Sequence, residues 1–258
     1  MPSEDKIMDA KTLAYINLHA ILGSIPRLCE MVPEAKKLIE GKDVSIGFDV
    51  KDGPAGTLVF KDGKCSFVDG ADHCDVKLPF SSPEKFNGLI DGTTTPIPTK
   101  GFTRIGFLLK NFTKLTDLLT NYLQPEPSAL KDPTFFETST VLMFHLIVEA
   151  LAQIGDHDDI GKFSAGYITD GAIKVAIGGG PAAAIRAKNH VLTADHEDPG
   201  DDYTSCMEFQ DIHVARDLFD GNINAVASIG QGKVRICGMI SQVDNVNRIL
   251  DRVALYLT

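Results

Sequence analysis

A capped helix that ends at an Asp-Gly pair occurs twice in this chain, and this repeat limits the folds open to it. In the second half, Asp211 precedes a short apolar helical pattern and Asp220-Gly221 follows it. In the first half, Ser82 and Asp91-Gly92 hold the same places. Ser and Asp side chains accept hydrogen bonds from the first helical N–H groups, and glycine adopts the left-handed conformation that ends many helices.

Other landmarks repeat at nearly the same spacing. The two Asp-Gly pairs lie 129 positions apart, as do Gly101 and Gly230. Gly53-Pro54-Ala55 and Gly180-Pro181-Ala182 lie 127 positions apart, so two extra residues fall between, most simply in the acidic loop Asp195–Asp202. We interpret the chain as an internal duplication with a longer period than solenoid repeats. The proline-containing segment 125–133 is the predicted linker between domains 1–124 and 134–258.

Short strands and helices alternate within each half, which predicts an α+β fold with helices on one face of a sheet. Residues 44–50 alternate apolar and small or polar side chains, as a half-buried strand does. Further strands are predicted at 56–60, 64–68, 75–80 and 104–109, and at 161–169, 172–177, 183–187, 191–194 and 233–237. Helices are predicted within 1–40, at 138–154, and at the end of each half.

Each half resembles the sterol carrier protein 2 (SCP2)-like domain. The resemblance rests on the capped segments SSPEKFNGLIDG and DIHVARDLFDG and on the passages TRIGFLL and KVRICGMI, each followed by a closing helix. It implies two tandem repeats, each with a mixed, mostly antiparallel, curved sheet of about five strands covered by helices. Members often have a glycine soon after the last strand. Gly238 supplies it in the second half, whereas Leu109 stands at the expected place in the first.

The resemblance implies an apolar tunnel between sheet and helices, and hence a hydrophobic small-molecule partner such as a lipid, a fatty acid or an acyl compound. The second half is favoured because it keeps Gly238 and has a flexible methionine after it. Spacing alone does not separate cavity wall from core. The predicted lipid-binding residues are Leu89, Phe107, Leu115 and Leu119 in the first half, and Leu218, Ile236, Met239, Ile249 and Val253 in the second.

Charge and composition limit the other partners and the location. The formal net charge of −10 argues against non-specific nucleic-acid binding and gives no help with an anionic membrane surface. The most apolar helix is interrupted by His145, Glu149 and Gln153, and no stretch reaches the roughly 20 apolar residues of a membrane span. The first residues lack a secretory pattern, and the five cysteines form no Cys-x-x-Cys. We therefore predict reduced cysteines and a cytoplasmic protein.

No residue pattern points to a catalytic, metal or cofactor site. Gly178-Gly179-Gly180 lacks a phosphate-loop ending and is interpreted as a turn. The acidic loop 195–202 does not fit a calcium loop, and His145 on an apolar helix is typical of a core histidine. The leading hypothesis is an intracellular, non-enzymatic carrier of a fatty acyl or sterol-like ligand. The alternatives are an interaction or structural protein with two solid cores, and an enzyme or an accessory domain of a lipid-related enzyme, which a polar cluster at a cavity mouth would favour.

Overall fold

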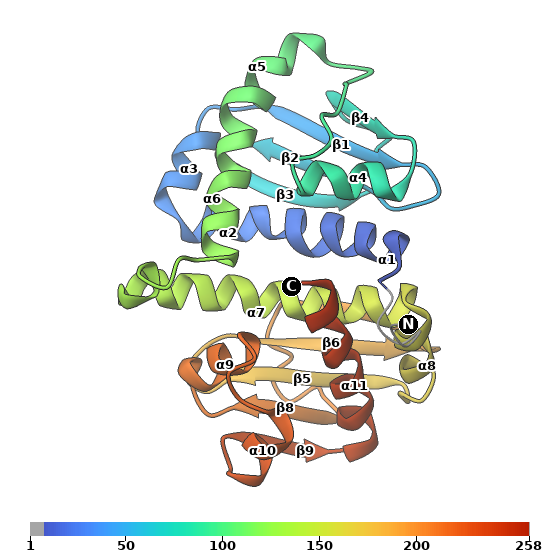
Figure 1. Ribbon diagram of the computed structural model, residues 1–258, viewed down its shortest axis with the longest axis vertical. Coiled ribbons are helices and arrows are strands. Elements are labelled where there is room, and N and C mark those ends of the chain that lie inside the picture. The colour runs from blue at the N-terminus through green and yellow to red at the C-terminus, as the bar shows by residue number, and fades with distance from the viewer. Residues whose placement is uncertain (1–7, 258) are drawn as a thin grey trace. The chain divides into compact units, whose positions relative to one another are not determined.

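The computed structural model describes residues 8–257, and the chain forms two compact units (Figure 1). The N-terminal unit comprises residues 9–142, and the C-terminal unit comprises residues 143–257 together with Met8. The division falls within the long helix α7 (Pro133–His157), which begins at the last residue of the predicted linker. The predicted domain limits of 1–124 and 134–258 stay a prediction.

The N-terminal unit has a four-stranded mixed sheet in the order β3-β2-β1-β4. Its strands are β1 (Val44–Val50), β2 (Ala55–Lys61), β3 (Lys64–Asp69) and β4 (Val76–Phe80). Strand β1 runs parallel to β4, and the other pairs are antiparallel. The β2–β3 hairpin turns at Asp62-Gly63, and both residues have positive φ, as the predicted tight turn requires.

Helices cover this sheet and close its core. They are α1 (Ala10–Tyr15), α2 (Ile25–Met31), α3 (Pro33–Ile39), α4 (Pro83–Ile90) and α6 (Thr113–Leu123). Shorter helical turns, η2 (Ile16–Ile21), η3 (Leu22–Ser24) and η6 (Ala129–Lys131), link these elements. The N-terminal helices turn at Val32, which adopts an extended conformation because Pro33 follows it. The core between sheet and helices is continuous, from the first helices to Leu142.

The predicted strand 104–109 is wrong: this stretch is helical. It forms η4 (Phe102–Arg104), α5 (Ile105–Phe107) and the wider turn η5 (Leu108–Phe112), which lead into α6. Phe107, Phe112 and Leu115 are buried in the core. Their spacing suits a helix that continues into α6, whereas strand alternation would turn some of them to solvent.

The C-terminal unit has a five-stranded sheet in the order β7-β6-β5-β8-β9. Its strands are β5 (Gly171–Ile177), β6 (Ala182–Lys188), β7 (Val191–Asp195), β8 (Ser205–Phe209) and β9 (Val234–Gly238). Strand β5 runs parallel to β8, and the other pairs are antiparallel. Four strands therefore repeat the order and directions of the N-terminal sheet. The β6–β7 turn also repeats two positive φ values, here at Asn189 and His190.

The helices of this unit are the C-terminal part of α7, α8 (Asp159–Ala165), α9 (Ile212–Phe219), α10 (Ala225–Gly230) and α11 (Ile240–Tyr256). The predicted strand 161–169 is wrong. Its first part, up to Ala165, belongs to helix α8, and Asp158 caps this helix. The Asp158 carboxylate accepts a hydrogen bond from Gly161 N at 2.8 Å. A Cβ at Gly161 would lie 2.1 Å from the carbonyl oxygen of Ile154, so only glycine fits this close turn.

Gly238 at the end of β9 has a counterpart in the N-terminal unit, but it is Gly101 and not position 109, where the sequence pattern placed it. Gly238 has a φ of 74°, and a Cβ there would lie 2.1 Å from the carbonyl oxygen of Thr204, just before β8. Gly101 has a φ of 85° and lies as closely against Asp75, just before β4. Gly101 therefore corresponds to Gly238, and neither Leu109 nor Gly230 is its counterpart. In place of β9, the N-terminal unit has a single bridge between Lys77 and Lys100.

Helix α7 is long and apolar enough to cross a membrane, the only helix among residues 8–257 of which this holds. Its most apolar window is 61% buried within the protein. Burial of this extent is typical of a core helix.

Candidate functional site

The apolar face of the C-terminal sheet is the first candidate site. Strand register places Val175, Met207 and Ile236 in one row across β5, β8 and β9. The next row contains Ile177, Phe209 and Val234. Helix α9 covers part of this face, since the rings of Phe209 and Phe219 meet edge to face with centroids 5.7 Å apart. Side chains in the middle of the face are buried, but Ile236 on the edge strand β9 is only half-buried.

The predicted lipid-binding residues of the N-terminal unit lie in packed core. Phe107, Leu115 and Leu119 are buried members of the continuous core, and Leu89 packs against it. The Phe107 ring lies 5.1 Å from that of Phe60 on β2. These residues have the surroundings of structural core.

The predicted residues of the C-terminal unit fall into two groups. Ile249 and Val253 on α11 are buried. Leu218 on α9 and Ile236 are half-buried, and Met239 is 43% exposed just before α11. We call Leu218, Ile236 and Met239 the edge set: Ile236 lies on β9, Leu218 on α9, and Met239 between β9 and α11.

Ile249 lies where three elements pack closely. A Cβ at Gly155 of α7 would come within 2.4 Å of Leu192 on β7 and 3.6 Å of the Ile249 side chain. Gly155 therefore allows α7 to approach β7, and Ile249 of α11 lies within ordinary contact distance. The Ile249 side chain is only 1% exposed.

The start of α11 is held by a buried amide. Gln242 Oε1 accepts hydrogen bonds from the hydroxyls of Thr204 and Ser205, each at 2.8 Å. Its Nε2 donates to the carbonyl oxygen of Thr169 at 2.9 Å and to the Thr169 hydroxyl at 3.2 Å. Gln242 thus fixes the end of α11 that carries Met239 against the loop before β5 and the start of β8.

The other end of α11 is held by a buried ion pair. Arg252 Nη2 donates to Asp158 Oδ2 at 2.6 Å, and the Tyr256 hydroxyl donates to the same oxygen at 2.7 Å. Burial raises the pKa of Asp158, but the hydrogen bonds from Arg252 and Tyr256 outweigh it and bring the pKa below its usual value. The carboxylate is therefore charged at neutral pH. The sequence did not predict this ion pair, because its partners lie 94 positions apart.

A chain of polar side chains runs along one side of α7. Nδ1 of His145 lies 3.2 Å from Nδ1 of His196, and Nε2 of His196 lies 3.0 Å from Glu149 Oε2. Gln153 Nε2 donates to the other oxygen of Glu149 at 2.8 Å. Since one nitrogen of the His145–His196 contact must donate and the other accept, the two rings do not both carry two protons in this arrangement. These α7 residues, His145, Glu149 and Gln153, are spaced four positions apart, which places them on one side of a helix. The sequence therefore contained a signal for this polar row.

A cleft of about 430 Å³ opens beside α7 and α8. It is lined by Gly155, Asp156, His157, Lys162, His190 and Val191. Burial raises the pKa of Asp156, although the carboxylate accepts a hydrogen bond from Leu192 N at 2.8 Å. None of the predicted lipid-binding residues lines this cleft, and its ionisable side chains do not suit an acyl chain.

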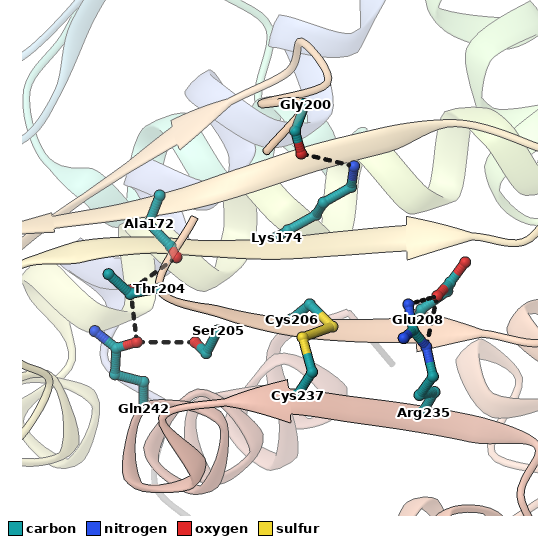
Figure 2. The surroundings of a disulfide bond; sticks show 10 residues. All are labelled: Ala172, Lys174, Gly200, Thr204, Ser205, Cys206, Glu208, Arg235, Cys237 and Gln242. Carbon is teal, nitrogen blue, oxygen red and sulfur yellow. Dashed lines mark hydrogen bonds and ion pairs between the residues drawn. A yellow bond between two sulfur atoms is a disulfide. The ribbon is translucent and has the colours of Figure 1, made fainter. Parts of the chain in front are cut away.

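The opposite face of the C-terminal sheet is polar and carries a disulfide bond between Cys206 and Cys237 (Figure 2). These residues are directly opposed in the β8–β9 register, with Cα atoms 5.0 Å apart. The prediction that all cysteines are reduced is therefore wrong for this pair. The sequence contains no paired-cysteine motif because the pairing comes from strand register. Next to the disulfide, Arg235 on β9 forms an ion pair with Glu208 on β8.

The acidic loop 195–202 lies over this polar face and is held by basic side chains. Lys174 donates to Asp198 at 2.7 Å and to the Gly200 carbonyl oxygen at 3.2 Å. Arg186 pairs with both Asp195 and Asp202. Hydrogen bonding to Arg186 lowers the pKa of Asp195, and hydrogen bonding to Lys174 lowers that of Asp198. The carboxylates of this loop thus neutralise basic residues of the sheet.

The described part of the chain has no group of three or more His, Cys, Asp or Glu side chains placed to hold a metal ion. Three cysteines, Cys29, Cys65 and Cys74, are buried free thiols. A hydrogen bond with Cys29 and burial both raise the pKa of Cys65 far above its usual value. A thiol held in its protonated form is a poor nucleophile and a poor metal ligand.

Comparison with known proteins finds structural similarity only. No family model matches the sequence, and no curated protein matches it. The chain is similar to the solution structure of sterol carrier protein domain 2 of Helicoverpa armigera, with 16% identity over 45% of this chain and 88% of that one, and a TM-score of 0.35. It is also similar to apo sterol carrier protein 2 from Yarrowia lipolytica, with 16% identity over 40% and 90% of the two chains and a TM-score of 0.29.

Proposed function

We propose that the C-terminal unit binds a long-chain lipid or fatty acyl compound along the edge of its apolar sheet face. The observation that carries the proposal is the incomplete burial of the edge set, Leu218, Ile236 and Met239, next to a face whose middle is fully packed. Each CH₂ group that leaves water contributes about 0.8 kcal/mol. An acyl chain lying against this edge therefore gains affinity without a specific polar motif.

The hydrogen bonds of Gln242 support this arrangement. They fix the start of α11 to Thr169, Thr204 and Ser205. Met239 consequently stays beside the end of β9, where its flexible side chain can adapt to ligands of different shape. We expect the ligand to displace Met239 and the half-buried side chains and to leave the packed Ile249 and Val253 in place.

Fluorescent fatty-acid titration of the full chain tests the proposal, together with native mass spectrometry and organic extraction of the purified protein. We expect saturable binding at micromolar concentration and a loss of at least tenfold in affinity for Ile236→Glu and Met239→Glu, because both place a charge where an acyl chain would lie. The matched control is Val226→Glu on α10, a residue that is 69% exposed in the same unit. It should bind as the wild type does.

Circular-dichroism melts accompany each titration, so that loss of binding can be separated from loss of fold. Saturable binding that all three variants retain would place the ligand elsewhere and contradict the proposal. The absence of both saturable binding and copurified lipid would favour the interaction or structural protein. The four predicted lipid-binding residues of the N-terminal unit pack in or against its core, which favours a structural role for that unit. Transport or storage of the ligand and the cytoplasmic location remain parts of the proposal.

A further inference from the structure

One segment of the N-terminal unit is strongly basic although the protein is acidic. Between Asp91 and Asp117 the sequence contains no acidic residue, while the whole chain carries a formal charge of −10. The segment contains four basic side chains, all exposed. They are Lys100, Arg104, Lys110 and Lys114. We call residues 97–114 the basic apolar segment.

The same segment exposes large apolar side chains. Ile97 is 76% exposed, Phe102 62% and Leu109 71%. Single exposed apolar residues are ordinary, but three within 13 positions of a basic stretch form a distinct surface feature. This combination of apolar and basic side chains is typical of protein surfaces that lie in the headgroup region of a membrane.

The segment is firmly attached to the unit by its other side. Phe107 and Phe112 are buried in the core, and Asn111 Nδ2 donates to the Leu38 carbonyl oxygen on α3 at 2.7 Å. Lys100 Nζ donates to the Cys74 carbonyl oxygen at 2.6 Å, which fixes the start of the segment. Phe102 and Leu109 are therefore presented by the anchored helical turns η4 and η5, and Ile97 by the loop before them.

We propose that the basic apolar segment docks the protein onto an anionic lipid bilayer. Charge complementarity identifies the occupant: Arg104, Lys110 and Lys114 attract acidic headgroups, while the apolar side chains enter the outer part of the acyl region. Nucleic acid is the poorer partner, because it offers no acyl region that the exposed aliphatic side chains of Ile97 and Leu109 could enter. The inference stands apart from the proposed ligand site, since it concerns other residues in the other unit.

Cosedimentation of the full chain with vesicles tests the inference. One set contains phosphatidylcholine alone and the other phosphatidylcholine with phosphatidylserine. We expect binding to the anionic vesicles only, and weaker binding as salt is raised. Each basic side chain near such a surface contributes about fivefold to partitioning, so Arg104→Glu/Lys110→Glu should bind at least about 25-fold more weakly. Phe102→Ser/Leu109→Ser should also lose binding, at unchanged net charge.

Matched controls come from the β2–β3 hairpin of the same unit. Lys61→Glu/Lys64→Glu makes the same change in net charge at two exposed lysines, and Val68→Ser removes an exposed apolar side chain. Both should bind as the wild type does. The inference is overturned if the wild type ignores anionic vesicles, or if the hairpin variants lose as much binding as the segment variants. The vesicles carry no fatty-acid probe, so the two assays are independent. The protein can bind fatty acid without binding vesicles, or bind vesicles without binding fatty acid.

Discussion

Replacing Asp158 by asparagine should destabilise the C-terminal unit more than any surface substitution. The carboxylate is buried and joins three elements: it follows α7, caps α8 through Gly161 N, and accepts hydrogen bonds from Arg252 and Tyr256 of α11. Asparagine keeps the size of the side chain and an oxygen for the cap. It removes the charge that compensates the buried Arg252 guanidinium.

The magnitude follows from the burial of both partners. Removing one partner of a buried ion pair costs about 3–5 kcal/mol, because the other charge is left uncompensated in a poorly solvated place. Asp158→Asn and Arg252→Met should therefore each cost about that much. The double variant should cost less than the sum, with a coupling energy of about 0.5–3 kcal/mol. An exposed pair on the same helix, Asp244–Arg248, provides the control, and Asp244→Asn should cost less than about 1 kcal/mol.

The assay is urea denaturation of the full chain at neutral pH, with hydrogen exchange to locate the change. Exchange should accelerate in 159–165 and 240–256, the helices that Asp158 joins, and stay unchanged in the N-terminal sheet. Because hydrogen bonding brings the folded pKa of Asp158 below its unfolded value, its contribution is present above about pH 3.9 and lost as pH falls through the folded pKa. The Asp158→Asn variant should not show the loss of stability that protonation of Asp158 causes in the wild type. Equal costs for Asp158→Asn and Asp244→Asn, or additive costs in the double variant, would refute the reasoning.

Three further predictions concern stability, each measured by denaturation midpoints. Asp211→Ala should cost about 1–2 kcal/mol and Ser82→Ala nearer 0.5, because Asp211 accepts two cap bonds at 2.9 Å and Ser82 only one, at 3.5 Å. Asp156→Asn should stabilise the protein at neutral pH and lose this effect in acid, since burial raises the pKa of Asp156 and its charge costs stability. Reducing Cys206–Cys237, which closes a 31-residue loop, should cost about 3–4 kcal/mol, and Cys206→Ser/Cys237→Ser should be insensitive to reductant.

Features that depend on neighbouring residues could be predicted from the sequence. Ser82 and Asp211 cap α4 and α9, as their positions before apolar helical patterns indicated. The Asp62-Gly63 turn joins two strands at the predicted place. The α+β class followed from the same local patterns, because caps and tight turns are decided by side chains within a few residues.

The last strand of each unit shows where sequence spacing failed. A constant offset of 129 residues paired 104–109 with 233–237, but the structure pairs Gly101 with Gly238, which are 137 positions apart. The difference arises after α9, where the C-terminal unit has an additional helix, α10, before β9. A short apolar run such as 104–109 fits a strand or a helix, and only the packing of Phe107 and Phe112 decides between them.

Contacts between distant residues could not be predicted from one sequence. Asp158 lies 94 positions from Arg252, and Cys206 lies 31 from Cys237, so no local pattern links them. Strand register brings the cysteines together, and the packing of α8 against α11 brings the charges together. The predicted lipid-binding list had the same difficulty, because apolar spacing alone does not separate the buried Ile249 from the half-buried Leu218.

The divergence after α4 and α9 also explains why the two proposals fall in different units. In the C-terminal unit, β9 extends the sheet and is joined to β8 by the disulfide and by the Arg235–Glu208 pair, so its half-buried Ile236 borders an ordered apolar face. In the N-terminal unit, the corresponding residues make one bridge, at Lys100, and the chain turns directly into helix. The apolar side chains there have no strand to border and face solvent among basic residues. A sheet edge of this kind suits an acyl chain, whereas an exposed basic helix suits a charged lipid surface.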